Sequence, residues 1–474
     1  MKLKTGLLLV FFIGNIVTLL AQRQDSVRYE INLNALSSTG SQSPFWMQSN
    51  RFGIISASPH SLTALLRAEK DFRHDKRLLD YGFNVTLLTQ ADNRTATNPV
   101  YLHEAYAKFR LLVFDLIVGA REKHLGCQDA DLSSGGFLFS TNARPMPKIT
   151  AGIEEYTAIP FTKGFAEIKG ALSHGWFNDP RYVKNALLHH KYAFIKLGGT
   201  LPVHLQYGFE HAAQWGGNHP VYGVQSVNFD SFQRVFLAGA GGDDATHNDR
   251  YNALGNHIIS QSAAADVSFG GYVVNVYWQN LFEDPPVKYI WQKTNHMPDG
   301  LWGITVENKK FPFVRKVLYE YFNSTDQSGP YHDKDGIIYG GNDSYFSNGI
   351  YQSGWTYFSR TIGIPFIAPP EKVADNYYLS PNDRVQLHHI GVMGTVGEYD
   401  YKLKASFSRN YGTYSVSFPD VITNQSWMLE VSKQFSRFYG VEVGCSLGVD
   451  TGKLYGNSFG ALVSIKKSGL LFGF

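Results

Sequence analysis

The sequence has few cysteines, little net charge and hardly any long apolar runs. Cys127 and Cys445 are its only cysteines, which excludes a disulfide-rich scaffold. The two could pair in an oxidising compartment, but two separate thiols are the more common arrangement. Lys and Arg outnumber Asp and Glu by only 43 to 40, so charge gives no indication of a nucleic-acid partner. After residue 21, no run reaches the roughly 20 apolar residues that a membrane-spanning helix needs.

The one apolar run, at residues 6–20, belongs to an export signal. Two lysines precede it and Ala21 follows it as a small residue suited to cleavage. Position 22 is Gln rather than Cys, so we expect no lipid anchor on the mature N-terminus. The sequence therefore predicts a signal peptide over 1–21 and an exported chain without a helical anchor.

Glycine and aromatic residues are abundant. The chain has 46 Gly and 15% aromatic residues, with a mean hydropathy of −0.21. Many turns and interfacial girdles of aromatic residues are typical of a membrane β-barrel. No linker or low-complexity stretch divides the chain. We therefore predict an N-terminal strand or plug segment over 22–61 and one closed sheet over 62–474.

Alternation of apolar and polar residues predicts β-strands, most clearly near the C-terminus. Trp427, Leu429 and Val431 share one face of a predicted strand, and Glu430 and Ser432 share the other. A soluble sandwich would turn the apolar faces inward, whereas a barrel in lipid turns them outward and keeps polar faces on its lumen.

Strand signals recur along the chain at lengths near the ten residues of a tilted membrane strand. One short helix is expected, from Phe229 to Ala238. The predicted strands are 62–72, 79–90, 101–110, 112–121, 149–158, 164–176, 188–199, 203–214, 257–268, 270–281, 301–308, 314–325, 350–360, 384–396, 399–410, 425–435, 439–450 and 456–466.

The long connections favour a barrel over a sandwich. They cover 122–148, 215–256, 282–300 and 326–349, and each follows an even-numbered predicted strand, so all four emerge on one side. Long loops on one side and short turns on the other are the outer-membrane pattern. The stretch 411–424 falls on the wrong side unless a strand is missing between 361 and 383, which leaves between sixteen and twenty strands.

Short motifs follow one another in a fixed order along the mature chain. They are Pro44–Trp46, Ser49–Gly53, Leu132–Gly136, Ser140–Pro147, Gly208–His211, Gln214–Gly217, Gly255–His257, Phe282–Asp284, Asp299–Gly303, Glu320–Tyr321, Asp326–Pro330, Ser353–Trp355 and Asn410–Gly412. As an ordered set they resemble the capsule assembly Wzi family of outer-membrane proteins. The resemblance implies an 18-stranded barrel with an obstructed lumen that acts as a surface lectin for capsular polysaccharide. This chain lacks the helical bundle that follows the signal peptide in the best-known branch.

Several motifs resemble phosphate-binding or metal-binding sites but lack residues or spacing that those sites need. The Gly-rich segment 132–147 lacks the Lys-Ser/Thr of a phosphate loop, so we expect it to fold over or into the barrel. The pairs His189-His190 and His388-His389 cannot chelate a metal together, because neighbours on a strand face opposite sides. Acidic turns such as Asp333–Gly336 and Asp243-Asp244 with Asp249 lack the spacing of a calcium loop. Hydrolase motifs are absent, and we predict no cofactor and no metal.

The predicted binding residues lie in external loops. Sugars stack on aromatic rings and bind polar side chains through their hydroxyls, although the same rings could serve as interfacial anchors. The candidates are Arg144, Trp215, His219, Trp291, His296 and Tyr331.

The sequence thus predicts an all-β transmembrane antiparallel barrel of about 18 strands in the outer membrane of a Gram-negative cell. Its expected role is non-enzymatic binding of capsular or other exported polysaccharide at the cell surface. Lipid, and in some arrangements the polysaccharide export machinery, are the other expected partners. A diffusion porin is the main alternative, and a surface enzyme that trims the polysaccharide is a weaker one.

Overall fold

A computed structural model describes residues 26–72, 78–92, 100–242, 250, 253–283, 298–308, 310–327, 333–334, 337–338, 343–375 and 377–472. The predicted signal peptide lies outside these residues. Among the residues described, no helix is both long and apolar enough to cross a membrane.

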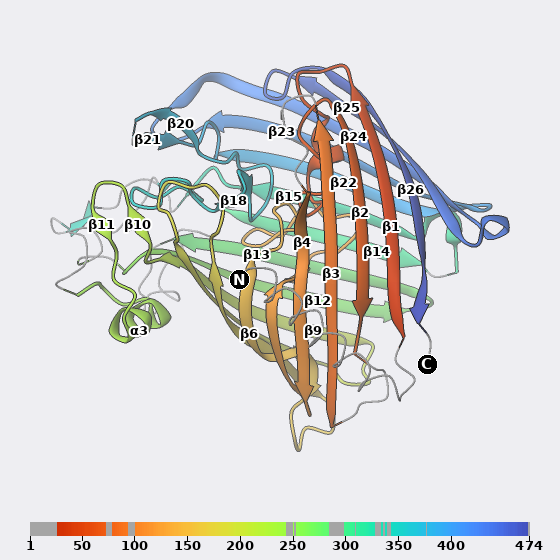
Figure 1. The fold of residues 1–474 in the computed structure, drawn as a ribbon, viewed down its shortest axis with the longest axis horizontal. Helices are drawn as coiled ribbons and strands as arrows, with labels where there is room; N and C mark the ends of the chain where they lie inside the picture. Colours follow the sequence, from red (N-terminus) through yellow and green to blue (C-terminus); the bar gives the residue numbers. More distant parts are fainter. Residues whose placement is uncertain are drawn as a thin grey trace, which may run out of the picture.

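The chain forms a closed barrel of 18 antiparallel strands (Figure 1). Each strand pairs with its neighbour in sequence among the barrel strands, and β1 pairs with β26 to close the sheet. The strands are β1 (Val27–Ser38), β2 (His60–Lys70), β3 (Leu79–Asp92), β4 (Val100–Leu111), β5 (Phe114–Ala120), β6 (Pro147–Ala158), β7 (Ala166–Trp176), β8 (Leu187–Leu197), β9 (Val203–Trp215), β12 (Asn256–Phe269), β13 (Tyr272–Glu283), β14 (Gly300–Asn308), β15 (Lys316–Asn323), β22 (Val385–Val396), β23 (Tyr399–Gly412), β24 (Ser417–Phe435), β25 (Val441–Gly452) and β26 (Ser458–Phe472).

Side chains alternate between the lumen and the exterior along each strand. On β2, Leu62 is 62% exposed on the outside, whereas Thr63 is 3% exposed and faces the lumen. On β24, Trp427 and Leu429 lie on the exposed face, as predicted. An apolar exterior around a polar interior is the arrangement of a lipid-facing barrel.

β22 departs from this rule. Val385 and Leu387 are fully buried and face inward, where they pack in the largest apolar cluster of the protein. The lumen therefore contains apolar material as well as polar wall groups.

All but one of the predicted strands are present in the barrel. The strand predicted at 350–360 is wrong: this stretch holds Tyr351 and Trp355, which are buried within the apolar cluster, and only the two-residue strands β18 (Thr356–Tyr357) and β19 (Arg360–Thr361) form nearby. Its aromatic run follows from burial inside the barrel rather than from strand pairing.

The N-terminal boundary of the barrel also differs from the prediction. β1 is a full barrel strand, so the barrel begins at Val27 and not at residue 62. Removal of the strand predicted at 350–360 restores the side of the stretch 411–424, which becomes a tight turn followed by the long strand β24. No additional barrel strand lies among the described residues between 361 and 383; the small hairpin β20 (Glu371–Ala374) and β21 (Tyr377–Leu379) lies there instead.

The four predicted long connections do share one end of the barrel, which we call the loop end. The opposite end, the turn end, holds short turns such as 270–271 and 397–398 and the paired outer ends of β1 and β26. The predicted short helix is confirmed as α3 (Phe229–Leu237), which lies with the hairpin of β10 (Asn218–His219) and β11 (Gly223–Val224) at one side of the barrel (Figure 1).

Three segments from the loop end fold into the lumen, and we call them the plug: residues 39–59, 121–146 and 343–370. The first contains the one-turn helix α2 (Phe45–Gln48), all of whose apolar side chains are buried. The plug and the lumen wall share one apolar cluster. Its buried aromatic members include Trp46, Phe137, Phe177, Tyr277, Phe322, Tyr345, Phe346, Trp355 and Phe366. The expected obstruction of the lumen thus has the form of a packed hydrophobic core.

Polar groups of the wall hold the plug in register. The buried carboxylate of Glu320 accepts hydrogen bonds from Ser133 Oγ (2.6 Å), from the backbone N–H of Ser134 (2.7 Å) and from the hydroxyl of Tyr277. His389 Nε2 lies 2.8 Å from the carbonyl oxygen of Leu132. Because an unpaired buried polar group is costly, each of these wall groups favours the plugged state.

Replacing Glu320 by alanine should loosen the plug. Three buried donors would lose their acceptor, and we expect a loss of about 3 kcal/mol in the free energy of unfolding. Denaturant unfolding of the detergent-solubilised barrel measures this loss. Glu155→Gln, at a carboxylate that is 71% exposed, is the control and should leave the midpoint unchanged. Equal stability of Glu320→Ala and the parent would contradict the role of Glu320.

Candidate binding cavity

A cavity of about 550 Å³ lies at the loop end, above the apolar core of the plug. It lies beside the ends of β1, β3 and β25, and plug segments form most of the rest of its lining. The exposed residues Glu371 and Pro381 belong to its boundary. The cavity is therefore large enough for a few sugar rings and lies on the side of the long loops.

Arg144 packs against two aromatic rings at the cavity. Its guanidinium carbon lies 3.9 Å from the ring centroid of Tyr101, on β4, and 4.4 Å from that of Phe358, in the plug. These cation–π contacts hold the guanidinium in place.

Arg360 lies beside Arg144. It donates to the backbone carbonyls of Gln48 (3.0 Å) and Ile55 (2.7 Å), which ties the first plug segment to the third. Gly53 separates the two arginines: a Cβ there would lie 2.9 Å from Arg144 Cγ and 3.7 Å from Arg360 Cδ. Burial and the positive charge of Arg144 lower the pKa of Arg360 to about 10, so the Arg360 guanidinium is still charged at neutral pH.

A strained turn presents the Phe358 ring. Phe358 and Ser359 join β18 to β19, and both have positive φ angles, of 48° and 59°. A two-residue turn of this kind favours Asn-Gly, because the left-handed region costs a residue with a Cβ about 1–2 kcal/mol. Backbone strain of this size is common at binding sites. Here the strained turn places the ring of Phe358 against Arg144.

The opposite wall is aromatic and amide-rich. The ring of Phe45 lies 4.4 Å from that of Phe366 and stacks on Tyr455 at 5.1 Å between centroids. Its backbone N–H donates to Asp450 Oδ2 at 2.8 Å. Amide side chains complete the lining: Gln42, Gln48, Gln90, Asn142 and Asn382. Rings for apolar sugar faces, with amides and guanidiniums for hydroxyl and acidic groups, make a set of groups suited to carbohydrate.

Of the six residues predicted for binding, the structure places only Arg144 in this cavity. Trp291, His296 and Tyr331 lie outside the described residues. Trp215 is 2% exposed on the outer surface of β9, where it packs with Val235 and Phe232 of α3. The helix covers the outside of the barrel at this point, so Trp215 does not face a binding space.

His219 is likewise a structural residue. Its Nδ1 accepts hydrogen bonds from the backbone N–H groups of Val221 and Tyr222, both at 3.0 Å, and its ring packs on that of Tyr182. It shapes the β10–β11 turn, and only 4% of its surface is exposed.

The histidine pairs divide between faces, as predicted. His389 is buried in the lumen against the plug, and His388 lies on the other face beside Tyr319. His190 packs on Phe139 of the plug, whereas His189 lies under Phe232 and Phe236 of α3. Among the described residues, no group of three or more His, Cys, Asp or Glu is arranged to hold a metal.

The two cysteines are not bonded to each other. Cys445 is exposed, whereas Cys127 lies in the plug. Burial raises the pKa of Cys127 to about 12, so its thiol is protonated at neutral pH and is a weak nucleophile.

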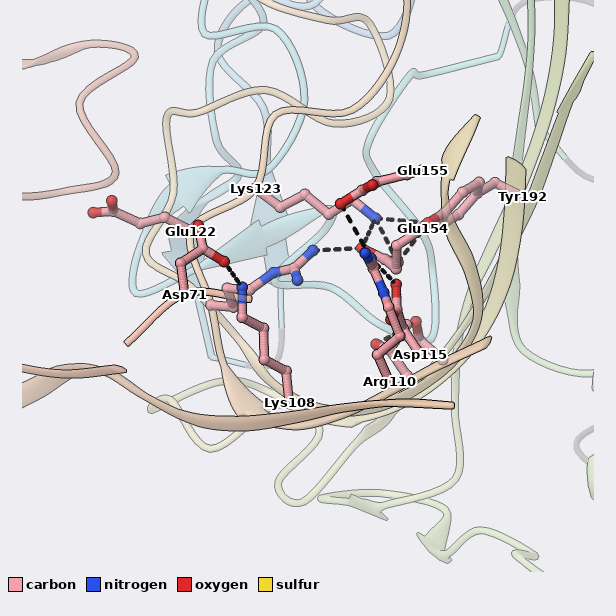
Figure 2. Close-up of polar contacts among 12 residues, drawn as sticks. Asp71, Lys108, Arg110, Asp115, Glu122, Lys123, Glu154, Glu155 and Tyr192 are labelled. Atoms are coloured by element: carbon pink, nitrogen blue, oxygen red, sulfur yellow. Dashed lines mark hydrogen bonds and ion pairs between the residues drawn. The ribbon is translucent and has the colours of Figure 1, made fainter. Parts of the chain in front are cut away.

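A network of ion pairs joins β4, β5 and β6 to the start of the second plug segment (Figure 2). Glu154 accepts from Lys123 at 2.8 Å and from Tyr192 at 2.6 Å, and it also pairs with Arg121. Burial lowers the pKa of Lys123 to about 8 despite the attraction of Glu154.

In the same network, Arg110 forms a two-point contact with Asp115, and its NH2 also reaches Glu155 at 3.1 Å. Both arginines named in this network, Arg110 and Arg121, therefore pair with carboxylates.

Sequence reasoning missed Phe358, Arg360, Phe366 and Tyr455. The available signal was the motif Ser353–Trp355, which lies close to the cavity hairpin in sequence, but the stretch was interpreted as a barrel strand. Nothing in the sequence spacing shows that the plug segments 39–59, 121–146 and 343–370 meet.

The fold and the cavity define a plugged β-barrel of the outer-membrane type. A family model described as capsule assembly protein Wzi matches residues 50–390, and the chain belongs to this family. Comparison with curated proteins gives no significant sequence match.

Solved structures show the same fold at low identity. Wzi of Escherichia coli, an outer membrane protein involved in group 1 capsule assembly and a carbohydrate-binding β-barrel, is 14% identical with a TM-score of 0.58, covering 97% of this chain and 88% of its own. OccK2 (OpdF) of Pseudomonas aeruginosa is 8% identical with a TM-score of 0.50, covering 95% and 98%. A BenF-like porin of Pseudomonas fluorescens Pf-5 is 9% identical with a TM-score of 0.50, covering 94% and 99%.

Trp215→Ala should destabilise the barrel, because it leaves a space under α3. We expect a loss of about 3–5 kcal/mol in the free energy of unfolding. Trp302→Ala removes an outward tryptophan that is 43% exposed and should cost clearly less. Thermal unfolding in detergent compares the two variants, and equal losses would show that Trp215 is not packed under the helix.

Proposed function

We propose that this protein is an outer-membrane barrel that binds capsular or other exported polysaccharide at the cell surface through the loop-end cavity. The cavity carries the proposal: stacked rings, amides and guanidiniums converge in about 550 Å³ of space on the side of the long loops. Family membership supports it independently. The role is binding and anchoring, without chemical change to the sugar chain.

Retention would arise from repetition. A polysaccharide presents the same unit many times, so many weak contacts between surface-bound barrels and one long chain add up to strong anchoring. Single sites with modest affinity are sufficient for this role. The export machinery is the expected source of the chain, and a docking surface for it belongs to the proposal.

The apolar outer surface supports a position of the barrel in lipid. Leucine and valine side chains such as Leu62, Leu66, Val85, Leu116 and Val463 are exposed on the outward faces of their strands, and water would disfavour such a surface. The loop end then faces outward and the turn end faces the periplasm.

The alternative, a diffusion porin, needs an open lumen with charged constriction residues. The charged wall is present in Figure 2. However, the packed core of the plug fills the lumen with apolar rings, which favours binding over solute passage.

Removal of the Phe358 ring should weaken polysaccharide binding. Phe358→Ala deletes a stacking surface and one of the two rings that fix Arg144, so we expect at least a tenfold loss of affinity. Retention of the cell's own exported polysaccharide on immobilised barrel measures this loss.

Ser359→Gly is the matched control in the same turn. It keeps the ring and relieves a left-handed residue, so the barrel should gain about 0.5–1 kcal/mol of stability and keep its affinity. Full retention by Phe358→Ala, or no retention by the parent, would contradict the proposed site.

A further inference from the structure

Arg144 and Arg360 differ from five other arginines of the barrel in their lack of an acidic partner. Within the described residues, neither has a carboxylate oxygen within 4.0 Å, whereas the guanidiniums of those five do. Those paired arginines are Arg51 with Glu430, Arg67 with Glu104, Arg110 with Asp115, Arg121 with Glu154 and Arg181 with Asp179.

The acidic groups that line the cavity do not neutralise the pair. Asp450 receives the backbone N–H of Phe45, and Glu371 is exposed at the boundary of the cavity. Two like charges held against the same glycine repel each other, and their burial removes the water that would screen them. An anion bound between them would offset both costs.

The geometry suits a planar or tetrahedral anion. The Arg144 guanidinium packs on the rings of Tyr101 and Phe358, a contact that holds the group and leaves N–H groups for a ligand. Arg360 uses one nitrogen each for Gln48 and Ile55 and keeps further N–H groups. Guanidinium edges bind carboxylate and phosphate oxygens in two-point fashion.

We propose that the cavity recognises an acidic sugar, with the anionic substituent of the polysaccharide bound between Arg144 and Arg360. This inference rests on the proposed function and specifies its ligand class. The aromatic wall of Phe45, Phe366 and Tyr455 takes the sugar ring, and the arginine pair takes the charge. Neutral polysaccharides then bind weakly, and added salt lowers affinity for the acidic chain.

The test compares three forms of the exported polysaccharide from the same cells. One is native, one has its carboxyl groups reduced to alcohols, and one is dephosphorylated. Binding to the detergent-solubilised full barrel is measured for the parent and for Arg144→Gln, Arg144→Lys and Arg437→Gln. Arg437 is an exposed arginine of the turn end and controls for loss of one positive charge.

We expect the parent to bind native chains at least tenfold more tightly than one of the two neutralised forms, because charge-assisted hydrogen bonds are lost. Loss on carboxyl reduction identifies a uronate-type group, and loss on dephosphorylation identifies a phosphate. Arg144→Gln should abolish this discrimination, Arg144→Lys should restore part of it, and Arg437→Gln should leave it unchanged. Unfolding midpoints of all variants establish that each is folded.

Equal binding of native and both neutralised chains by the parent would overturn the acidic-sugar assignment and leave the polysaccharide role standing. Discrimination that survives in a folded Arg144→Gln barrel would also overturn it. If the parent binds none of the three chains, the proposed function fails and the assignment fails with it.

Discussion

The structure depends on one constraint: buried polar groups of the lumen wall need hydrogen-bond partners. In this barrel the plug supplies partners for several of them. Glu320 binds two successive residues of the plug, Gln279 accepts the backbone N–H of Phe137 at 2.8 Å, and Trp46 donates to Ser406 at 3.0 Å. The wall and the plug are therefore one hydrogen-bonded unit around a hydrophobic core.

This constraint explains the position of the cavity. The core of the plug occupies the middle of the lumen, so free space remains above it, at the loop end. Residues from all three plug segments and from the wall meet there, which lets Arg360 bind the carbonyls of the first segment while its neighbour Phe358 covers Arg144. Because the plug segments form the site, the stability of the site depends on the packing of the plug.

Much of the barrel could be predicted from sequence because period-two alternation is local. The strands of the C-terminal half, the helix α3 and the shared side of the long loops all follow from patterns within some fifteen residues. The plug could not be predicted in this way. The aromatic run near Trp355 has the composition of a strand. Only the folded structure shows that it lies inside the barrel, where Trp355 Nε1 donates to the carbonyl oxygen of Leu138 at 2.8 Å.

The site residues were hard to predict for the same reason. Aromatic and histidine residues in loops were reasonable candidates, yet Trp215 serves a helix outside the barrel and His219 serves a turn. Arg144 was found because a Gly-rich loop was expected to enter the barrel. Its partners Phe358 and Arg360 are more than two hundred residues away in the sequence. Only the folded barrel brings them close to Arg144.

The most direct test of this account is the conductance of the purified parent barrel in a planar lipid bilayer. A lumen filled by a hydrogen-bonded plug predicts membrane insertion without a steady ion current. A large and stable conductance in the unmodified barrel would show an open lumen and would contradict the packed plug on which the cavity rests.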